Sequence, residues 1–123
     1  VNHDALAEIS YQCQHKNKVF KYSLAQQTLC DSISGYDFIL PKDSYQLCEI
    51  GCSLHNCVAS YDESILKKQC TIVCAKKEGK YKICIELWGK NIIQELSDKN
   101  KMPSEEEKKI LDEWHLRHNL IPN

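Results

Sequence analysis

Glycine and proline are scarce in this sequence, with four and three residues among 123, and this disfavours a small domain built from short strands and tight turns. No apolar run approaches the roughly 20 residues that cross a bilayer, and there is no Asn-x-Ser/Thr sequon. The 16 basic and 17 acidic residues nearly balance, so we expect neither nucleic acid nor an anionic membrane as the main partner. These absences favour one small helical domain over residues 1–123, without a membrane span.

Cysteine, in contrast, is abundant, with eight residues. An even number in a short chain indicates a disulfide framework formed in an oxidising compartment. No Cys-x2-Cys pair occurs, which makes a zinc site the minor alternative. The sequence starts at Val1 rather than Met, as a secreted protein does after its signal peptide is removed. We therefore expect a secreted, extracellular domain with no cofactor.

Two Cys-x3-Cys pairs organise the predicted architecture, Cys48 with Cys52 and Cys70 with Cys74. Residues four apart lie on one face of an α-helix, so each pair is expected to line one side of a helix. Two such helices packed antiparallel would close the nested disulfides Cys48–Cys74 and Cys52–Cys70. The predicted fold class is all-α: a small disulfide-rich helical domain built on a stapled antiparallel helical hairpin, with about five helices.

The other four cysteines are assigned less directly. Cys57 lies about 140° around the helix from Cys52, so it points away from the hairpin. Cys84, on the apolar face of the next expected helix, is its natural partner, which leaves Cys13 with Cys30. The last pair is open, since Cys13 and Cys30 could instead reach the hairpin.

The run Cys57-x12-Cys70-x3-Cys74-x9-Cys84 resembles the final four cysteines of the crustacean hyperglycemic hormone family and of related helical arthropod toxins. This resemblance implies the bridges Cys57–Cys84 and Cys52–Cys70. It rests on spacing alone, and the arginine- and aspartate-rich signature of that family is missing, so the family is not assigned.

Local signals place most of the expected helices. Capping boxes start at Ser23, Ser60 and Ser104, and Asp43 or Ser44 starts the first hairpin helix. Ser34-Gly35 is expected to form a turn in the loop over 31–42. The expected helices cover 4–14, 23–30, 43–59, 60–78, 80–97 and 104–118.

Residues 80–97 are ambiguous. Tyr81, Ile83, Ile85 and Leu87 alternate as they would in a β-strand, whereas a longer pattern of apolar residues fits a helix over the whole segment. Length favours the helix, with a possible irregularity at Gly89.

The strongest candidate for catalysis is the segment Cys52-Ser-Leu-His55-Asn56-Cys57, which is similar to the active-site helix of secreted phospholipase A2. The resemblance implies that His55 activates water next to a calcium-binding carboxylate. Here Asn56 replaces that carboxylate, and no glycine-rich calcium loop precedes it. We therefore expect His55 to pack on the hairpin and the chain not to be an enzyme. His115 and His118 are interpreted as surface histidines rather than metal ligands.

A rigid extracellular scaffold suits recognition, because it loses little entropy on binding. The predicted function is a secreted binding protein (a toxin, salivary factor or effector) that acts on an unidentified extracellular or host protein. The predicted contact residues are Phe38, Ile39, Leu40 and Trp114. For the Phe38–Leu40 segment by itself, base rates of apolar burial favour a cover over one end of the core, and the partner contact is the functional alternative.

The alternative function is an extracellular carrier of a small apolar ligand. Secreted helical disulfide proteins can enclose apolar cavities. The expected cavity lies among Leu24, Ile85, Trp88 and Ile92.

Overall fold

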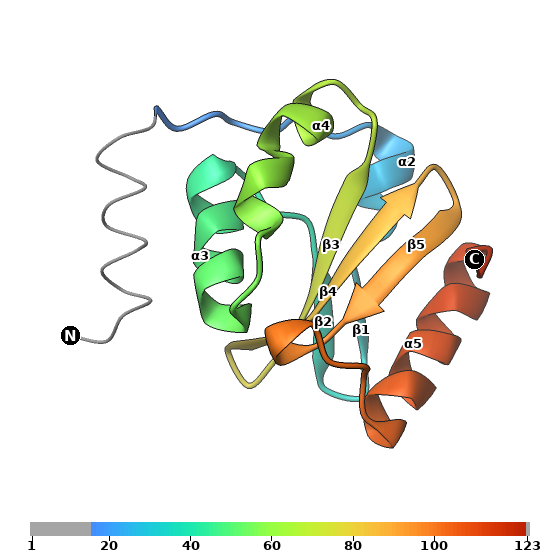
Figure 1. Cartoon of the computed structure of the whole chain (residues 1–123). Coiled ribbons are helices and arrows are strands. Elements are labelled where there is room, and N and C mark those ends of the chain that lie inside the picture. Colours follow the sequence, from blue (N-terminus) through green and yellow to red (C-terminus); the bar gives the residue numbers. More distant parts are fainter. Residues whose placement is uncertain (1–15, 123) are drawn as a thin grey trace.

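The computed structural model describes residues 16–122 and contains a five-stranded antiparallel sheet with helices on both faces (Figure 1). The strands follow one another in sequence order from one edge of the sheet to the other. The fold is therefore α/β with an antiparallel sheet, and the prediction of an all-α domain is wrong. The elements are α2 (Leu24–Gln27), β1 (Asp31–Ile33), β2 (Tyr36–Ile39), α3 (Ser44–Leu54), η1 (Val58–Tyr61), α4 (Asp62–Leu66), β3 (Thr71–Lys77), β4 (Lys80–Trp88), β5 (Asn91–Leu96), η2 (Asp98–Asn100) and α5 (Glu105–His118).

Two hairpins of the sheet turn through residue pairs with positive φ. The pairs are Ser34-Gly35, with φ of 48° and 86°, and Glu78-Gly79, with φ of 53° and 78°. Two consecutive residues with positive φ match the right-handed twist of the adjoining strands, which is why such turns close two-residue hairpins. The turn predicted at Ser34-Gly35 is confirmed.

The predicted second hairpin helix and the predicted helix over 80–97 are both wrong. The first five residues of β3 are all buried, as in a strand covered on both faces, and only five residues before it form α4. In β4, the alternation of Ile83, Ile85 and Leu87 reflects a strand, since all three side chains are fully buried. Gly89, with φ of 60°, lies in the turn between β4 and β5.

Helix start signals were more reliable than helix lengths. The capping boxes at Ser23 and Ser104 are both formed, and Asp43 caps α3. The box predicted at Ser60 is absent, because its hydroxyl donates to the carbonyl of Cys57 instead. Within residues 16–122, no helix has the length and apolar character needed to cross a membrane.

Each face of the sheet has its own core. One face packs against α5, with a cluster that includes Phe38, Val73, Ile83, Ile85, Leu87, Ile110, Leu111 and Trp114. The opposite face packs against α3, η1 and α4, with a cluster that includes Leu47, Ile50, Leu54, Val58, Ile65, Ile72 and Cys74. The sheet is therefore the middle layer of a three-layer domain.

Trp114 anchors α5 to the sheet. Its side chain is fully buried and stacks on Phe38, with ring centroids 4.6 Å apart and an interplanar angle of 13°. The indole Nε1 donates a hydrogen bond to the carbonyl oxygen of Leu29 at 2.9 Å. Both Phe38 and Trp114, predicted as partner contacts, thus contribute to the core.

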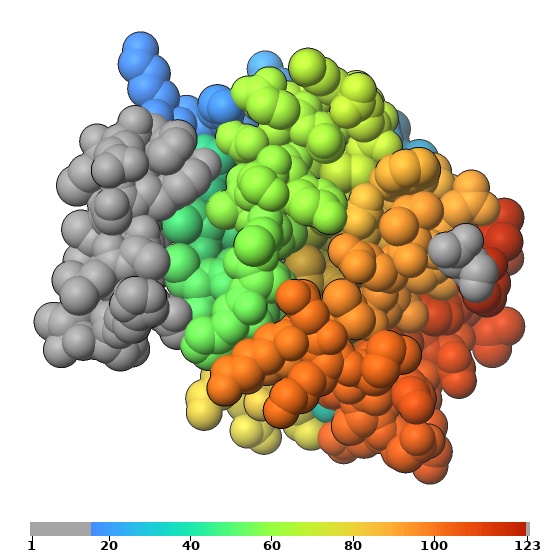
Figure 2. Space-filling view, in the orientation of Figure 1, coloured from blue at the N-terminus to red at the C-terminus, as the bar shows by residue number. Residues whose placement is uncertain are grey.

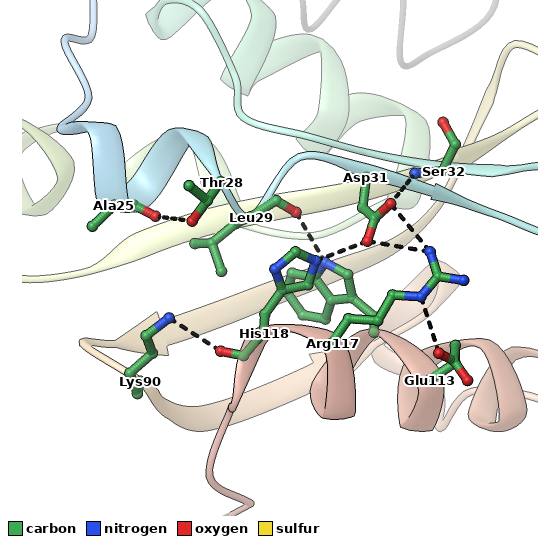
Figure 3. Close-up of polar contacts among 10 residues, drawn as sticks. Ala25, Thr28, Leu29, Asp31, Ser32, Lys90, Glu113, Arg117 and His118 are labelled. Atoms are coloured by element: carbon green, nitrogen blue, oxygen red, sulfur yellow. Dashed lines mark hydrogen bonds and ion pairs between the residues drawn. The ribbon is translucent and has the colours of Figure 1, made fainter.

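Two histidine–carboxylate pairs join α5 to opposite edges of the sheet. His118 Nε2 lies 2.8 Å from Asp31 Oδ2 on β1, where Arg117 also approaches Asp31 at 3.3 Å (Figure 3). His115 Nε2 lies 2.5 Å from Glu95 Oε2 on β5. The two histidines expected to be surface residues are half-buried and connect elements.

The described cysteines form no disulfide with one another, so the predicted pairs Cys48–Cys74, Cys52–Cys70 and Cys57–Cys84 are wrong. Cys70 lies directly before β3 and Cys74 within it, rather than on a helix facing α3, and Cys84 lies on β4 rather than on a helix. The partner proposed for Cys30, Cys13, lies outside the described residues.

Candidate functional site

A cavity of about 350 Å³ lies between the segment that follows α3 and the last two strands of the sheet. Figure 2 shows the surface of this region, with η1 in yellow-green and η2 in orange. Its lining combines amide, thiol, phenol and carboxyl groups with a few apolar side chains. The lining residues are Asn56, Cys57, Val58, Tyr61, Ile72, Cys84, Glu86, Gln94, Leu96 and Asn100.

The sharp end of α3 brings Asn56 and Cys57 to this cavity. His55 ends the helix in the left-handed conformation, with φ of 55°, and the Asn56 N–H donates to the carbonyl oxygen of Gly51. The Asn56 side chain then accepts a hydrogen bond from the Val58 N–H at 3.0 Å. A Cβ on Gly51 would lie 3.2 Å from the Asn56 carbonyl oxygen, so glycine lets the chain fold back closely against the helix.

The opposite rim is formed by η2, which is tied to the end of α3. His55 Nδ1 lies 2.7 Å from Asp98 Oδ1, and this hydrogen bond holds the pKa of the Asp98 carboxyl below its usual value. Lys99 and Asn100 both have positive φ, at 57° and 58°. Of these residues and His55, which also has positive φ, only Asn100 lines the cavity.

Glu86 is the most unusual group in the cavity wall. Its side chain is 8% exposed, and it is the one acidic or basic residue that is buried in the described part of the chain. Trp88 Nε1 donates to Oε2 at 2.8 Å, and Gln94 Nε2 donates to Oε1 at 3.2 Å. Two donors aimed at the two oxygens fit a carboxylate, which only accepts hydrogen bonds.

Glu86 forms no ion pair with any lysine, arginine or histidine in residues 16–122. Among the described residues, the ion pairs of lysine, arginine and histidine all involve other carboxylates. Burial, followed by the charge and hydrogen bonding of Glu86, raises the pKa of the Tyr61 phenol. Among the described residues, Glu86 is therefore partnered by neutral donors rather than by a cation.

The thiols next to Glu86 are poor nucleophiles. Burial and, secondarily, the Glu86 charge raise the pKa of Cys84 to about 12 and that of Cys70 to about 11. Both thiols are thus protonated at neutral pH, and only the thiolate is a strong nucleophile. Cys57, at the rim, is exposed.

The structure brings two residues of the predicted partner site together, Phe38 and Trp114, but in the core rather than on the surface. Phe38 and Trp114 are buried, whereas Ile39 and Leu40 are half-buried and pack against opposite faces of the sheet. The predicted apolar cavity is not assembled either: Leu24 is 80% and Trp88 55% exposed, whereas Ile85 and Ile92 belong to the core. Within residues 16–122, no group of three His, Cys, Asp or Glu residues is arranged to hold a metal ion.

Glu86, Tyr61 and Gln94 were not predicted as site residues. A signal for Glu86 was present in the alternation of β4, where Cys84, Glu86 and Trp88 occupy the face opposite to Ile83, Ile85 and Leu87. Because residues 80–97 were interpreted as a helix, this alternation was not used to place Glu86. The cavity does include part of the Cys52–Cys57 segment, which was the strongest catalytic candidate in the sequence.

The comparison with protein families matches residues 1–111 to the family described as PcfJ-like protein. The chain belongs to the PcfJ-like protein family. The match covers α2 to η2, every strand and the first half of α5, and therefore includes all residues of the cavity. No curated protein and no solved structure gave a significant match.

Proposed function

We propose that this PcfJ-like protein is a binding protein whose cavity takes a cationic group, held by the carboxylate of Glu86. One observation supports this most strongly: Glu86 is buried in the wall of an open cavity without a lysine or arginine partner among the described residues. A buried charge is costly unless it is paired, so a cation from outside the chain gains energy by pairing with it. A neutral apolar ligand would leave the charge uncompensated.

Binding accounts for the site better than catalysis does. The thiols of Cys70 and Cys84 are protonated at neutral pH. The Asn56 amide is engaged by the backbone of Val58, as a structural turn residue is. These features stabilise the cavity, and none of them activates a nucleophile.

A protein partner remains our proposal for the source of the cation, because basic side chains are abundant on protein surfaces. Secretion and an extracellular or host target stay predictions from the sequence. The argument from disulfides no longer supports them, since the described cysteines form none with one another.

The test is a titration of the full-length protein in which two-dimensional amide NMR spectra are recorded at each ligand concentration. The probes are butylammonium and butylguanidinium ions, and butylurea is the uncharged control of similar shape. We expect both cations to shift the resonances of Asn56, Tyr61 and Gln94, and butylurea to leave them nearly unchanged. Equal shifts with butylurea would show that charge is not what the cavity recognises.

Glu86→Gln removes the charge while keeping the size of the side chain. We expect at least about a tenfold loss of affinity for the cations, because a charge-assisted hydrogen bond to a buried group is lost. Glu78→Gln, on the exposed turn between β3 and β4, is the matched control and should bind normally. The spectrum of each variant also reports whether it is folded.

A further inference from the structure

A second cavity, of about 310 Å³, adjoins the first one along the same face of the sheet. It extends from Glu86 toward α4 and the end of β4, where Ser60, Ser64, Gln69 and Trp88 contribute to its lining. Tyr61 and Glu86 belong to both cavities. The two cavities thus meet at the buried carboxylate, and together they are named the η1 groove here.

The hydrogen bonds of Glu86 leave room for a planar donor. Trp88 occupies one acceptor site on Oε2 and Gln94 occupies one on Oε1, whereas a carboxylate has about four such sites. About two acceptor sites are therefore left. Among the described residues the Tyr61 hydroxyl approaches as a further donor to Glu86, so a guanidinium group that binds both oxygens displaces this hydroxyl. A guanidinium group donates two parallel N–H bonds, one to each oxygen, whereas an ammonium group acts as a point charge.

Trp88 provides a surface for the same group. Its side chain is 55% exposed, yet its N–H is bound to Glu86, so the indole ring is held beside the carboxylate. The cation–π contacts of the described lysines are with tyrosine rings, which leaves the Trp88 ring uncovered by them. Guanidinium groups stack on indole rings more readily than ammonium groups do.

The groove also has polar groups on both sides of Glu86. Asn56 and Asn100 lie at one end, and Ser60, Ser64 and Gln69 lie at the other. Hydroxyl and amide side chains both donate and accept hydrogen bonds, which suits the main chain of an extended segment. A small isolated ion would use only the centre of this groove.

We propose that the η1 groove binds an arginine side chain of an extended peptide segment, with the guanidinium paired to Glu86 and stacked on Trp88. This inference rests on the function proposed above and specifies its ligand. The arginine is supplied by a partner protein, and the polar ends of the groove bind the flanking main chain.

The test is isothermal titration calorimetry of the full-length protein with three peptides, acetyl-Gly-Gly-X-Gly-Gly-amide, where X is arginine, lysine or citrulline. We expect the arginine peptide to bind about tenfold or more tightly than the lysine peptide, and the citrulline peptide to show no measurable binding. Equal affinity for arginine and lysine would overturn this inference and leave the proposed function intact. Failure of both basic peptides would overturn this inference, while the NMR titration with simple cations reports on the proposed function separately.

Butylguanidinium is the fourth ligand and distinguishes the two sources of a guanidinium group. If it binds as tightly as the arginine peptide, the natural ligand is a small guanidinium compound and the peptide part of the inference is wrong. A weaker interaction of butylguanidinium supports a peptide ligand.

Two substitutions of Trp88 test the stacking contact. Trp88→Leu should lower affinity for the arginine peptide several-fold, whereas Trp88→Phe, which keeps an aromatic face, should retain most of it. The side chain is more than half exposed, so neither change removes a core residue. Equal affinities for the two variants would show that the ring face does not contact the ligand.

Discussion

At the scale of single residues, the four-residue spacing of cysteines is compatible with two structures. Positions i and i+4 share one face of a helix, but they also share one face of a strand, because four is a multiple of the strand period of two. Cys48 and Cys52 follow the first case on α3, with Sγ atoms 4.0 Å apart. Cys74 follows the second case on β3, where it lies opposite Cys84 on β4.

The cysteine side chains should therefore differ strongly in reactivity. In the folded protein, we expect brief treatment with iodoacetamide to alkylate the exposed Cys30 and Cys57 and to spare Cys70, Cys74 and Cys84. Burial raises the pKa of the last three thiols and also restricts access to them. Peptide mass spectrometry measures the labelled fraction at each site. Labelling of Cys84 as fast as that of Cys57 would contradict the raised pKa and the half-buried position of the Cys84 thiol.

At the scale of elements, local signals predicted the starts of α2, α3 and α5, whereas the start predicted at Ser60 was wrong and the strands were not predicted. Asp43 and Ser104 cap α3 and α5 through hydrogen bonds within three residues, which a sequence displays directly. In contrast, β3 and β4 are stabilised by pairing with each other and by cores on both faces. Those contacts join distant residues, so strand preference depends on context that a local pattern does not contain.

The attachment of α5 should depend on pH through Asp31. Hydrogen bonds from His118 and the Ser32 backbone, together with Arg117, hold the pKa of the Asp31 carboxyl below its usual value. A carboxyl with a lowered pKa stabilises the fold above its unfolded pKa of about 3.9, and this contribution is lost as pH falls through the folded pKa. We expect Asp31→Asn to lower the free energy of unfolding at pH 7 by about 1 kcal/mol, and to lower it less at acidic pH.

Urea unfolding of both proteins between pH 7 and pH 2 measures this difference. Asp112→Asn, which replaces an exposed carboxyl on α5, is the control. If the destabilisation caused by Asp31→Asn stays constant down to the lowest pH, the charge of the Asp31 carboxylate does not stabilise the packing of α5.

At the scale of the whole molecule, stability comes from the two cores on either side of the sheet. Fully buried side chains include Trp114 and Phe38 on one face and Leu47 and Ile50 on the other. Apolar burial of this kind stabilises a domain of ordinary size without crosslinks. Among the described cysteines, Cys48, Cys70 and Cys74 are buried and pack as small apolar residues.

Thermal unfolding should therefore depend little on reducing agent, since no bridge joins two of the described cysteines. A framework of four bridges would add roughly 2–4 kcal/mol per bridge, so its reduction would lower Tm sharply. We expect calorimetry with and without dithiothreitol to give the same Tm within a few degrees. A large decrease on reduction would reveal a disulfide that involves residues outside 16–122.

The sequence alone determined those features that a few neighbouring residues specify: the starts of α3 and α5, the capping box of α2 and the turn at Ser34-Gly35. The tertiary structure decided that residues 80–97 form strands, because both periods were present there and only long-range pairing selects between them. It also decided the site. Glu86 is an ordinary acidic residue in the sequence, and its burial beside Tyr61 and Trp88 arises only when β4 is covered by η1 and α4.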